Sequence, residues 1–296
     1  MNLRLWFLET RPQFLLLSVV LSFLGTCIAW YDGTFHLGYA LLAFLGLLLC
    51  HISVNVLNDY YDYKSGIDLH TRRTPFSGGS GLLPAAVLKP MPVLQLGLAC
   101  FLLAVPIGIY FVLVRGWLLL PLLVVGAICI LLYTPLLTRL GWVEWSPGIG
   151  MGALPILGIY FVQSGEYTVP AIVASVPSGI LVHNLLLLNE FPDTEADRAA
   201  GRKTLPITIG KRGAGIVYSA LLGAVYLWIF VAVQAELMPA FSLIALLTLP
   251  LAIKAIQGAL QPEDENKLMP AMANNVLLVL LTQLLLSMGY IAGGIF

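Results

Sequence analysis

Charged residues are scarce in this sequence, and their scarcity restricts the class of protein. Of the 296 residues, 10% are charged and 59% are hydrophobic. A soluble domain has about 25% charged residues, so the composition excludes an ordinary soluble domain and favours a membrane protein. Little of the chain remains outside the hydrophobic segments, and we expect one membrane domain over residues 1–296.

Cysteine is also rare, and its placement excludes two common roles. The four cysteines lie in separate apolar segments: Cys27, Cys50, Cys100 and Cys129. No spacing among them is that of a zinc site or of a disulfide framework. We therefore expect the cysteines to be small packing residues.

A signal-peptidase cleavage site is missing after the first apolar segment. That segment is longer than the apolar region of a usual signal peptide, and no A-x-A-like sequence follows it. Thr26 before Cys27 is also atypical of lipoprotein processing. The sequence therefore predicts that this first segment is retained as a membrane helix.

Long apolar runs are what the chain has in abundance. A helix that crosses the hydrocarbon core of a bilayer needs about 20 predominantly apolar residues. Nine segments meet this requirement: 13–31, 37–57, 91–114, 117–136, 147–163, 168–189, 213–234, 239–259 and 268–294. The predicted fold class is an all-α membrane protein with nine transmembrane helices around a central cavity.

The lysines and arginines orient these helices. If the N-terminus is cytoplasmic, fourteen of the fifteen basic residues fall on the cytoplasmic side, and only Arg115 lies outside. Membrane proteins retain positive charge on the cytoplasmic side, and one missed or extra helix would distribute these charges over both sides. The pattern predicts nine helices in the cytoplasmic membrane, with a cytoplasmic N-terminus.

Two clusters of acidic and amide residues interrupt the apolar pattern. The first is NVLNDYYDYKSGID at residues 55–68, after the second predicted helix. Four of its residues lie within an arc of about 100° on a helix: Asn55, Asn58, Asp59 and Asp62. They form a stripe that extends this helix toward the cytoplasm, and we expect the helix to end near Gly66, before Asp68.

The second cluster is NEFPDTEADRAAGRKT at residues 189–204, after the sixth predicted helix. Asn189, Asp193 and Asp197 are spaced four residues apart and share one helix face, whereas Glu195 lies away from it and is assigned to solvent. Both clusters follow even-numbered helices, so we expect them on the same side of the membrane. Their matching Asn-x-x-x-Asp skeletons suggest a diverged internal duplication.

Pro192 complicates the geometry of the second cluster. It removes one backbone donor and disfavours helical geometry at Phe191. We expect the helix either to kink there or to restart with Pro192 in its first turn. Asp193 and Asp197 keep their relation to each other in both cases, whereas the position of Asn189 depends on which alternative holds.

The chemistry of the two clusters suits a divalent metal and a phosphate. Mg²⁺ prefers one or two carboxylates together with substrate phosphates. Six basic residues accompany the clusters: Lys64, Arg72, Arg73, Arg198, Arg202 and Lys203. Together they predict a site for a phosphate-bearing substrate bridged by metal. Two alternatives remain open, namely solvated loop residues and a cation-coupled transporter, although transporters place such groups near the bilayer midplane.

At these residues the chain resembles the UbiA superfamily of membrane-embedded aromatic prenyltransferases. That family carries an N-D-x-x-D-type motif after its second helix and an N-x-x-x-D-x-x-x-D motif after its sixth. Here they read NDYYD (58–62) and NEFPDTEAD (189–197). Three further segments match the family: ETRP (9–12), YTPLLTRLGWVE (133–144) and GRKTLP (201–206). The resemblance covers essentially the whole chain.

The form NDYYDYKSGID, with Gly66 at a position where the family often has an acid and with Asp68 beyond it, resembles the naphthoate branch that makes menaquinone. Members of that branch often carry Asn-Asn and an arginine, where this chain has Asn189, Glu190 and Pro192. The resemblance implies transfer of a polyprenyl group from an allylic diphosphate to an aromatic acceptor, with 1,4-dihydroxy-2-naphthoate expected. Homogentisate, 4-hydroxybenzoate, a porphyrin and a glycerol phosphate remain alternative acceptors.

The resemblance also implies roles for individual residues. Five residues would hold two Mg²⁺ ions on the diphosphate: Asn58, Asp62, Asn189, Asp193 and Asp197. Asp59 and Asp68 would join them directly or through another ligand. Four basic residues would contact the diphosphate: Lys64, Arg72, Arg198 and Lys203. Tyr133 would lie near the reacting allylic carbon, where its ring face stabilises positive charge.

The acceptor and the lid over the cavity are less strongly marked in the sequence. Asn55, His51 and Asn184 are candidates for binding the acceptor. Interhelical hydrogen bonding is the alternative for Asn184, and a bond to a neighbouring backbone or side chain is the alternative for His51. The loop TPFSGGSGLLP (74–84) lacks the lysine and spacing of a P-loop, and we expect a mobile cap. The expected partners are a polyprenyl diphosphate, an aromatic acceptor and the lipid bilayer, with no nucleic acid.

Overall fold

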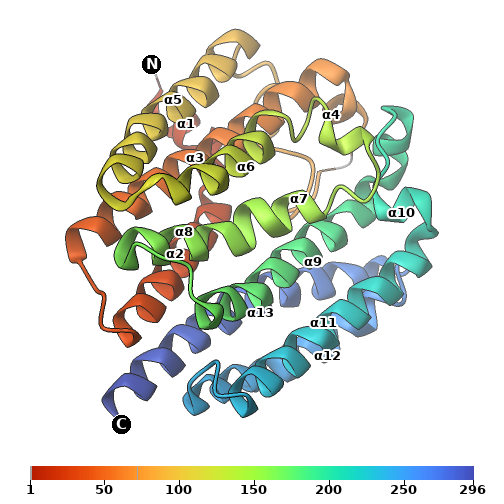
Figure 1. Cartoon of the computed structure of the whole chain (residues 1–296). Coiled ribbons are helices and arrows are strands. Elements are labelled where there is room, and N and C mark those ends of the chain that lie inside the picture. The colour runs from red at the N-terminus through yellow and green to blue at the C-terminus, as the bar shows by residue number, and fades with distance from the viewer. Residues whose placement is uncertain (1, 72) are drawn as a thin grey trace.

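The computed structural model describes residues 2–71 and 73–296, and for His70 it describes the backbone only. Within these residues the chain forms helices and loops, and no strand occurs. Figure 1 shows long helices that run side by side in one bundle. The predicted all-α class is confirmed.

Eight helical segments of the described chain are long and apolar enough to cross a membrane. Six are single helices: α2 (Pro12–Tyr31), α3 (Leu37–Ser65), α5 (Pro90–Arg115), α9 (Val169–Ala199), α11 (Gly210–Gln234) and α13 (Glu265–Ile295). Two are composite: α7 (Trp145–Gly148), η3 (Ile149–Ala153) and α8 (Leu154–Ser164) form one, and η4 (Ala240–Thr248) and α12 (Leu249–Ala259) form the other. Their positions agree with eight of the nine predicted segments.

The remaining predicted segment, 117–136, is shorter in the structure. It comprises η1 (Trp117–Leu119) and α6 (Leu120–Leu131), an apolar helix of fewer than 18 residues. Pro135 has no N–H to donate to the carbonyl of Leu131, and its ring would clash there in a continued helix, which accounts for the end of α6 at Leu131. The residues from Tyr133 onward form a loop at the end of the bundle that carries the two polar clusters.

Short helices complete the chain at that end. They are α1 (Leu3–Glu9), α4 (Ile67–His70), η2 (Leu137–Arg139) and α10 (Leu205–Thr208). The last turns of α13 pack instead at the opposite end, where the rings of Tyr31 and Tyr290 lie 5.5 Å apart. Because the two chain ends lie at opposite ends of the bundle, the chain crosses it an odd number of times.

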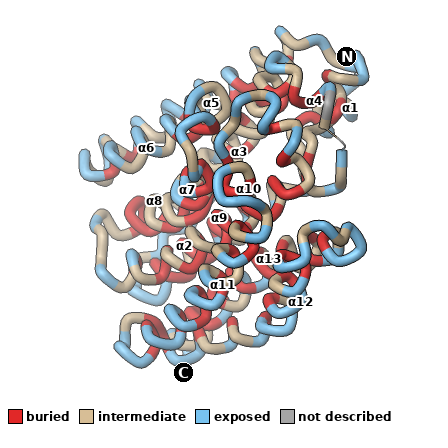
Figure 2. Tube along the Cα trace, turned by 90° about the vertical axis from the view of Figure 1, so that its right-hand side faces the viewer, coloured by how far each residue is buried: buried red, intermediate tan, exposed pale blue. Residues whose placement is uncertain are grey.

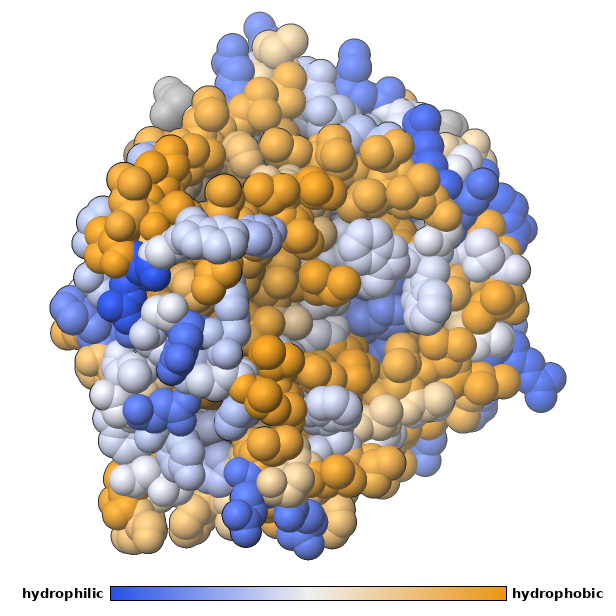
Figure 3. Space-filling view, viewed as in Figure 1, coloured by the Kyte–Doolittle hydropathy of each residue, from blue (hydrophilic) through white to orange (hydrophobic). Residues whose placement is uncertain are grey.

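Helix α9 is the centre of the packing. In the most apolar 18-residue stretch of each helix, 61% of the residues are buried in α9, but only 22% are buried in α3 and in α5. Buried residues follow α9, α2 and α13, whereas exposed residues follow the outer helices (Figure 2). Hydrophobic side chains cover much of the face of the molecule seen in Figure 3, which suits contact with lipid.

Glycines let the composite helix α7–η3–α8 approach α9. A Cβ atom added at Gly148 would lie 2.8 Å from the backbone oxygen of Gly179, and one added at Gly152 would lie 2.6 Å from that of Ser178. Only glycine permits such backbone contact between helices. This contact fixes the segment that carries Glu144 against the helix that carries the second cluster.

Both clusters lie on helices that keep their predicted faces. Helix α3 ends at Gly66, whose φ of 82° is left-handed, as predicted. Helix α9 continues through Pro192 to Ala199, so the alternative in which a new helix starts at Pro192 is wrong. Proline removes only one backbone hydrogen bond, and buried residues such as Phe191 hold the helix on either side.

Candidate active site

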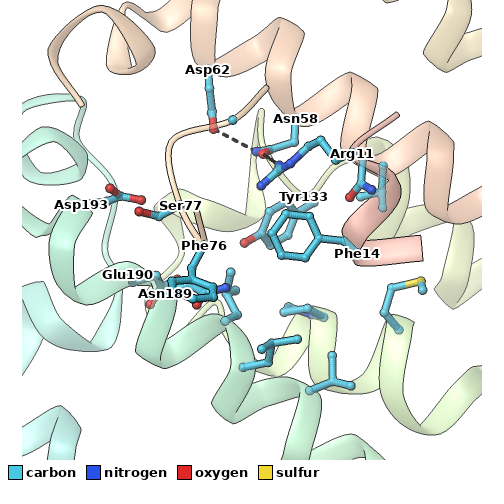
Figure 4. A pocket seen from close by; sticks show the side chains of 18 of the residues that line it. Arg11, Phe14, Asn58, Asp62, Phe76, Ser77, Tyr133, Asn189, Glu190 and Asp193 are labelled. Atoms are coloured by element: carbon cyan, nitrogen blue, oxygen red, sulfur yellow. Dashed lines mark hydrogen bonds between the residues drawn. The ribbon is translucent and has the colours of Figure 1, made fainter. Parts of the chain in front are cut away.

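The two clusters converge on one cavity of about 230 Å³. Its polar wall combines residues that are far apart in sequence: Asn55, Asn58, Asp62, Asp68, Asn189, Glu190, Asp193 and Asp197. Its apolar wall includes Phe14 and Leu17 of α2, Val182 and Leu186 of α9, and Val279 of α13. Figure 4 shows the two motifs on facing walls, with the ring of Tyr133 between them.

Arg202 connects the two clusters directly. Its Nη1 atom donates to Asp197 Oδ1 over 2.9 Å, and its Nη2 atom donates to Asp62 Oδ1. Asn58 Nδ2 donates to the other oxygen of Asp62 over 3.0 Å. Burial lowers the pKa of Arg202, but Asp62 and Asp197 raise it by more, so the guanidinium stays charged. Arg202 therefore neutralises one carboxylate from each cluster.

A second arginine lies on the other side of the first cluster. Arg11 precedes Pro12 with a left-handed φ of 56°, and its Nη1 atom lies 3.4 Å from Asn58 Oδ1 and 3.5 Å from Asp59 Oδ1. The Ser80 backbone N–H donates to Asp59 Oδ2 over 2.7 Å. Asp59 is thus engaged behind the cavity wall, and the structure gives it a positioning role.

The loop 74–84 covers the mouth of the cavity. Phe76, Ser77, Gly78 and Gly79 line it, and in Figure 4 Ser77 points toward Asp193 while Phe76 lies beside Asn189 and Glu190. Gly79 has a φ of 66°, and a Cβ atom there would lie 3.0 Å from Asp59 Oδ1. The close approach requires glycine, and the position of the loop fits the expected cap.

Glu9 anchors this loop from α1. It is fully buried, and its Oε2 atom accepts a hydrogen bond from Ser80 Oγ over 2.8 Å. Its Oε1 atom has no hydrogen-bond partner among the described residues. Burial and the nearby Asp59 raise the pKa of Glu9 to about 8, although Ser80 and Arg11 lower it.

We expect Glu9→Gln to change how the stability of the metal-free protein depends on pH. Because its pKa is raised from 4.5 to about 8, Glu9 binds its proton more tightly in the folded state. Its contribution to the free energy of unfolding is therefore lost as pH rises between these values. Thermal unfolding in detergent should show a smaller fall in melting temperature over this range for Glu9→Gln than for wild type. The exposed Glu263→Gln is the control and should follow wild type, and parallel curves for all three proteins would contradict this expectation.

Several predicted site residues do not line the cavity. Lys64, Arg198 and Lys203 are exposed, and Arg198 pairs with Glu195, which is also exposed, over 3.3 Å. Arg72 lies outside the described residues. The placement of these side chains therefore favours Arg11 and Arg202 as the cations that face a bound anion.

The candidate acceptor residues separate into two groups. Asn55 and His51 line the cavity, where Asn55 donates to the Thr10 carbonyl over 3.1 Å and His51 Nδ1 lies 2.8 Å from Ser18 Oγ. Asn184 is buried between helices and donates to the Tyr218 carbonyl over 2.9 Å. We therefore do not retain Asn184 as an acceptor residue, and interhelical bonding accounts for it.

Sequence reasoning missed three groups that face the cavity. Arg202 was grouped with the basic residues of the phosphate site but was not expected to contact the diphosphate individually. Arg11 was overlooked because its backbone turns at a position before proline. Glu190 precedes Asp193 by three residues and Asp197 by seven, which places the three within about 60° on a helix. Periodicity would have identified Glu190.

The residues of the cavity fit a hard divalent cation. Asn189 Oδ1 and Asp193 Oδ1 are buried, and neither has a hydrogen-bond partner in the described chain. Oxygen atoms in such positions are the ligands that Mg²⁺ prefers. Over residues 2–71 and 73–296, no three His, Cys, Asp or Glu side chains are arranged to hold a metal by themselves. Amide oxygens and a phosphate ligand would have to complete the coordination.

Comparison with known proteins agrees with this site. Residues 18–282 match the UbiA prenyltransferase family. The 1,4-dihydroxy-2-naphthoate octaprenyltransferase of Bacillus subtilis is 32% identical over 275 residues, which cover 90% of this chain and 86% of that protein. The enzyme of the same name from Escherichia coli is 26% identical and covers 96% and 94%.

A solved structure supports the fold. The UbiA homolog from Archaeoglobus fulgidus, bound to GPP and Mg²⁺, superposes with a TM-score of 0.58 at 14% identity, over 96% of this chain and 98% of that one. The family match covers most of the chain, and the naphthoate octaprenyltransferases match almost its full length. The chain therefore belongs to the UbiA prenyltransferase family and is a multi-pass membrane prenyltransferase.

Proposed function

We propose that the protein transfers a polyprenyl group from an allylic diphosphate to 1,4-dihydroxy-2-naphthoate. The observation that carries this proposal is the convergence of the two motifs on one cavity, where Arg202 contacts Asp62 and Asp197 from separate helices. The naphthoate octaprenyltransferases among its relatives support this choice of acceptor. Asp62 and Asp197 carry more negative charge than Arg202 alone can balance. Binding of a diphosphate beside them therefore requires additional positive charge.

We propose that Asn58, Asp62, Asn189, Asp193 and Asp197 hold Mg²⁺, with Asp68 beside them. When bound, Mg²⁺ supplies the positive charge that stabilises a departing diphosphate. Of these residues, Asn189 and Asp193 offer free buried oxygens. The homolog from Archaeoglobus fulgidus is bound to GPP and Mg²⁺, which supports Mg²⁺ as the cation of this proposal.

The residues of this chain would then perform three tasks. Arg202 and Arg11 bind the diphosphate as fixed cations beside the metal ligands. Phe14, Phe76 and Tyr133 present aromatic side chains to the cavity, and ring faces stabilise an allylic cation. The loop 74–84 limits the entry of water, which would otherwise capture that cation.

The polyprenyl tail would occupy an adjoining apolar cavity. This second cavity of about 410 Å³ lies between α3, α5, α6 and α8, and its lining is almost entirely hydrophobic. Ile130, Gly150 and Met151 line both cavities. A tail that starts at the diphosphate can therefore pass into a region that suits an isoprenoid chain.

We further propose that η1 and α6 complete nine crossings and that the active site faces the cytoplasm. The odd number of crossings fits eight long segments and this shorter one. Positive charge concentrates on the side that carries both motifs, as expected for a cytoplasmic face. The charged diphosphate group of the substrate would then lie toward the cytoplasm, and the apolar tail of the same substrate would enter from the bilayer.

The test is a substrate panel with purified protein in detergent. Prenyl diphosphates of several chain lengths are incubated with 1,4-dihydroxy-2-naphthoate, homogentisate and 4-hydroxybenzoate, with Mg²⁺ or with EDTA. We expect a prenylated product from the naphthoate only, and none with EDTA. Product from another acceptor would correct the proposed acceptor, whereas undiminished turnover in EDTA would contradict the role of the metal.

A further inference from the structure

A pair of buried glutamates adjoins the cavity and has no part in the mechanism above. Glu190 lies on α9 and lines the cavity, and its side chain is 6% exposed. Glu144 precedes α7 and is fully buried. The two carboxyl groups are within hydrogen-bonding reach of each other. They join the second motif to the helix that packs against it.

Glu144 is fixed in place beside Glu190. The backbone N–H of Leu205 donates to Glu144 Oε1 over 2.6 Å. Glu144 Oε2 and Glu190 Oε2 are both buried, and no donor to either occurs in the described part of the chain. Glu190 therefore keeps a buried carboxyl oxygen that is free to accept a hydrogen bond.

The position of Glu190 distinguishes it from the metal ligands. It precedes Asp193 by three residues, which places it about 4.5 Å deeper along the helix axis. At that depth it lies beside Phe76 (Figure 4) and is close enough to Tyr133 to influence it. If Asp193 holds the metal on the diphosphate as proposed, this deeper level is where the carbon bonded to the diphosphate and the acceptor ring would lie.

The first cluster contains the equivalent of Glu190 in a different state. Asp59 follows Asn58 as Glu190 follows Asn189. Asp59 accepts hydrogen bonds from Arg11 and from the backbone of Ser80, whereas Glu190 is paired only with another carboxyl group among the described contacts. A buried polar group without a donor is costly, so Glu190 is prepared to accept a hydrogen bond from a ligand.

We propose that Glu190, which lies beside Glu144, binds a hydroxyl group of the aromatic acceptor. This inference rests on the proposed function and assigns the acceptor its place in the cavity. The acceptor hydroxyl donates to a carboxyl oxygen of Glu190, which orients the ring beside Tyr133 and Phe76. Glu190 is thereby a residue that selects acceptors with a phenolic hydroxyl.

Kinetics of two variants with matched volume test this role. Glu190→Leu removes the acceptor oxygen, and Glu190→Gln keeps one oxygen while its amide donates to Glu144. We expect Glu190→Leu to raise the KM for the naphthoate about tenfold or more, and Glu190→Gln to raise it by less than about threefold. The KM for the prenyl diphosphate should change less than about twofold in both. Glu195→Gln, on the exposed face of the same helix, is the control and should leave both constants unchanged.

Three outcomes would overturn the proposal. An unchanged acceptor KM in Glu190→Leu would mean that the pair is only structural. An equal loss in Glu190→Gln and Glu190→Leu, or a shift in the KM for the prenyl diphosphate or in the Mg²⁺ requirement, would place Glu190 among the metal ligands instead. In each case the wild-type protein would still prenylate the naphthoate, so the proposed function would stand.

An inhibitor comparison keeps the test decisive if Glu190→Leu does not fold. The dimethyl ether of the naphthoate cannot donate a hydrogen bond, so we expect it to compete with the acceptor about tenfold more weakly in the wild-type protein. Glu144→Gln should weaken binding of the parent acceptor and leave binding of the ether unchanged. Equal affinity of the wild-type protein for the acceptor and its ether would refute the hydrogen bond.

Discussion

Asp62→Asn and Asp193→Asn should each reduce prenyl transfer by about a hundred- to a thousandfold. Each replaces a carboxylate of one motif by an amide of the same shape, so the site loses one anionic ligand for the Mg²⁺ that would neutralise the diphosphate. Removal of a single preorganised group from a reacting centre has effects of this size. Steady-state rates at saturating Mg²⁺ and both substrates provide the measurement.

The exposed neighbour of Asp193 supplies the control for this experiment. Glu195 lies two residues away, pairs with Arg198 and points to solvent. Glu195→Gln should retain the wild-type rate. Comparable activity in Asp62→Asn or Asp193→Asn would remove that aspartate from the proposed machinery.

Arg202→Gln should lower the stability of the metal-free protein by about 3–5 kcal/mol, because it leaves two buried carboxylates without their partner. The side chains of Asp62 and Asp197 are only 10% and 2% exposed, so solvent provides little compensation. Added Mg²⁺ should restore more stability to this variant than to wild type, because the cation can take the place of the guanidinium. Thermal unfolding in detergent, with EDTA and with Mg²⁺, measures both effects.

Arg198→Gln is the matched control for Arg202→Gln. The two arginines are four residues apart, yet Arg198 is 54% exposed and pairs only with an exposed glutamate among the contacts described. We expect Arg198→Gln to unfold at the wild-type temperature in both conditions. Equal melting of the two variants in EDTA would show that the bridge between Asp62 and Asp197 contributes no stability.

The helices and motifs of this fold were predictable from the sequence because their signals are periodic. Eight long apolar runs predicted the membrane-spanning segments, and Gly66 predicted the end of α3. In the structure Gly66 adopts a left-handed conformation at that end. The 100° periodicity placed Asp62 and Asp193 on faces that meet at one cavity. The segment 117–136 was predicted too long because hydropathy continues past Leu131, where α6 ends four residues before Pro135.

The arginines were not predictable, because they lie where periodicity stops. Helix α9 ends at Ala199, so the direction of Arg202 depends on the turn at Gly201 rather than on helical geometry. Arg198, inside the helix, was preferred and proved to face solvent. Asn184 was kept as an acceptor candidate although it lies about 140° from Asn189 on the same helix. This angle could have excluded it from the site.

The central claim is that the two motifs together bind one diphosphate. Calorimetric titration of inorganic pyrophosphate into the purified protein tests it without any catalytic step. We predict binding to wild type in Mg²⁺, no binding in EDTA, and loss of binding in both Asp62→Asn and Asp193→Asn. Undiminished, Mg²⁺-dependent binding in either variant would contradict the claim, because one motif would then suffice.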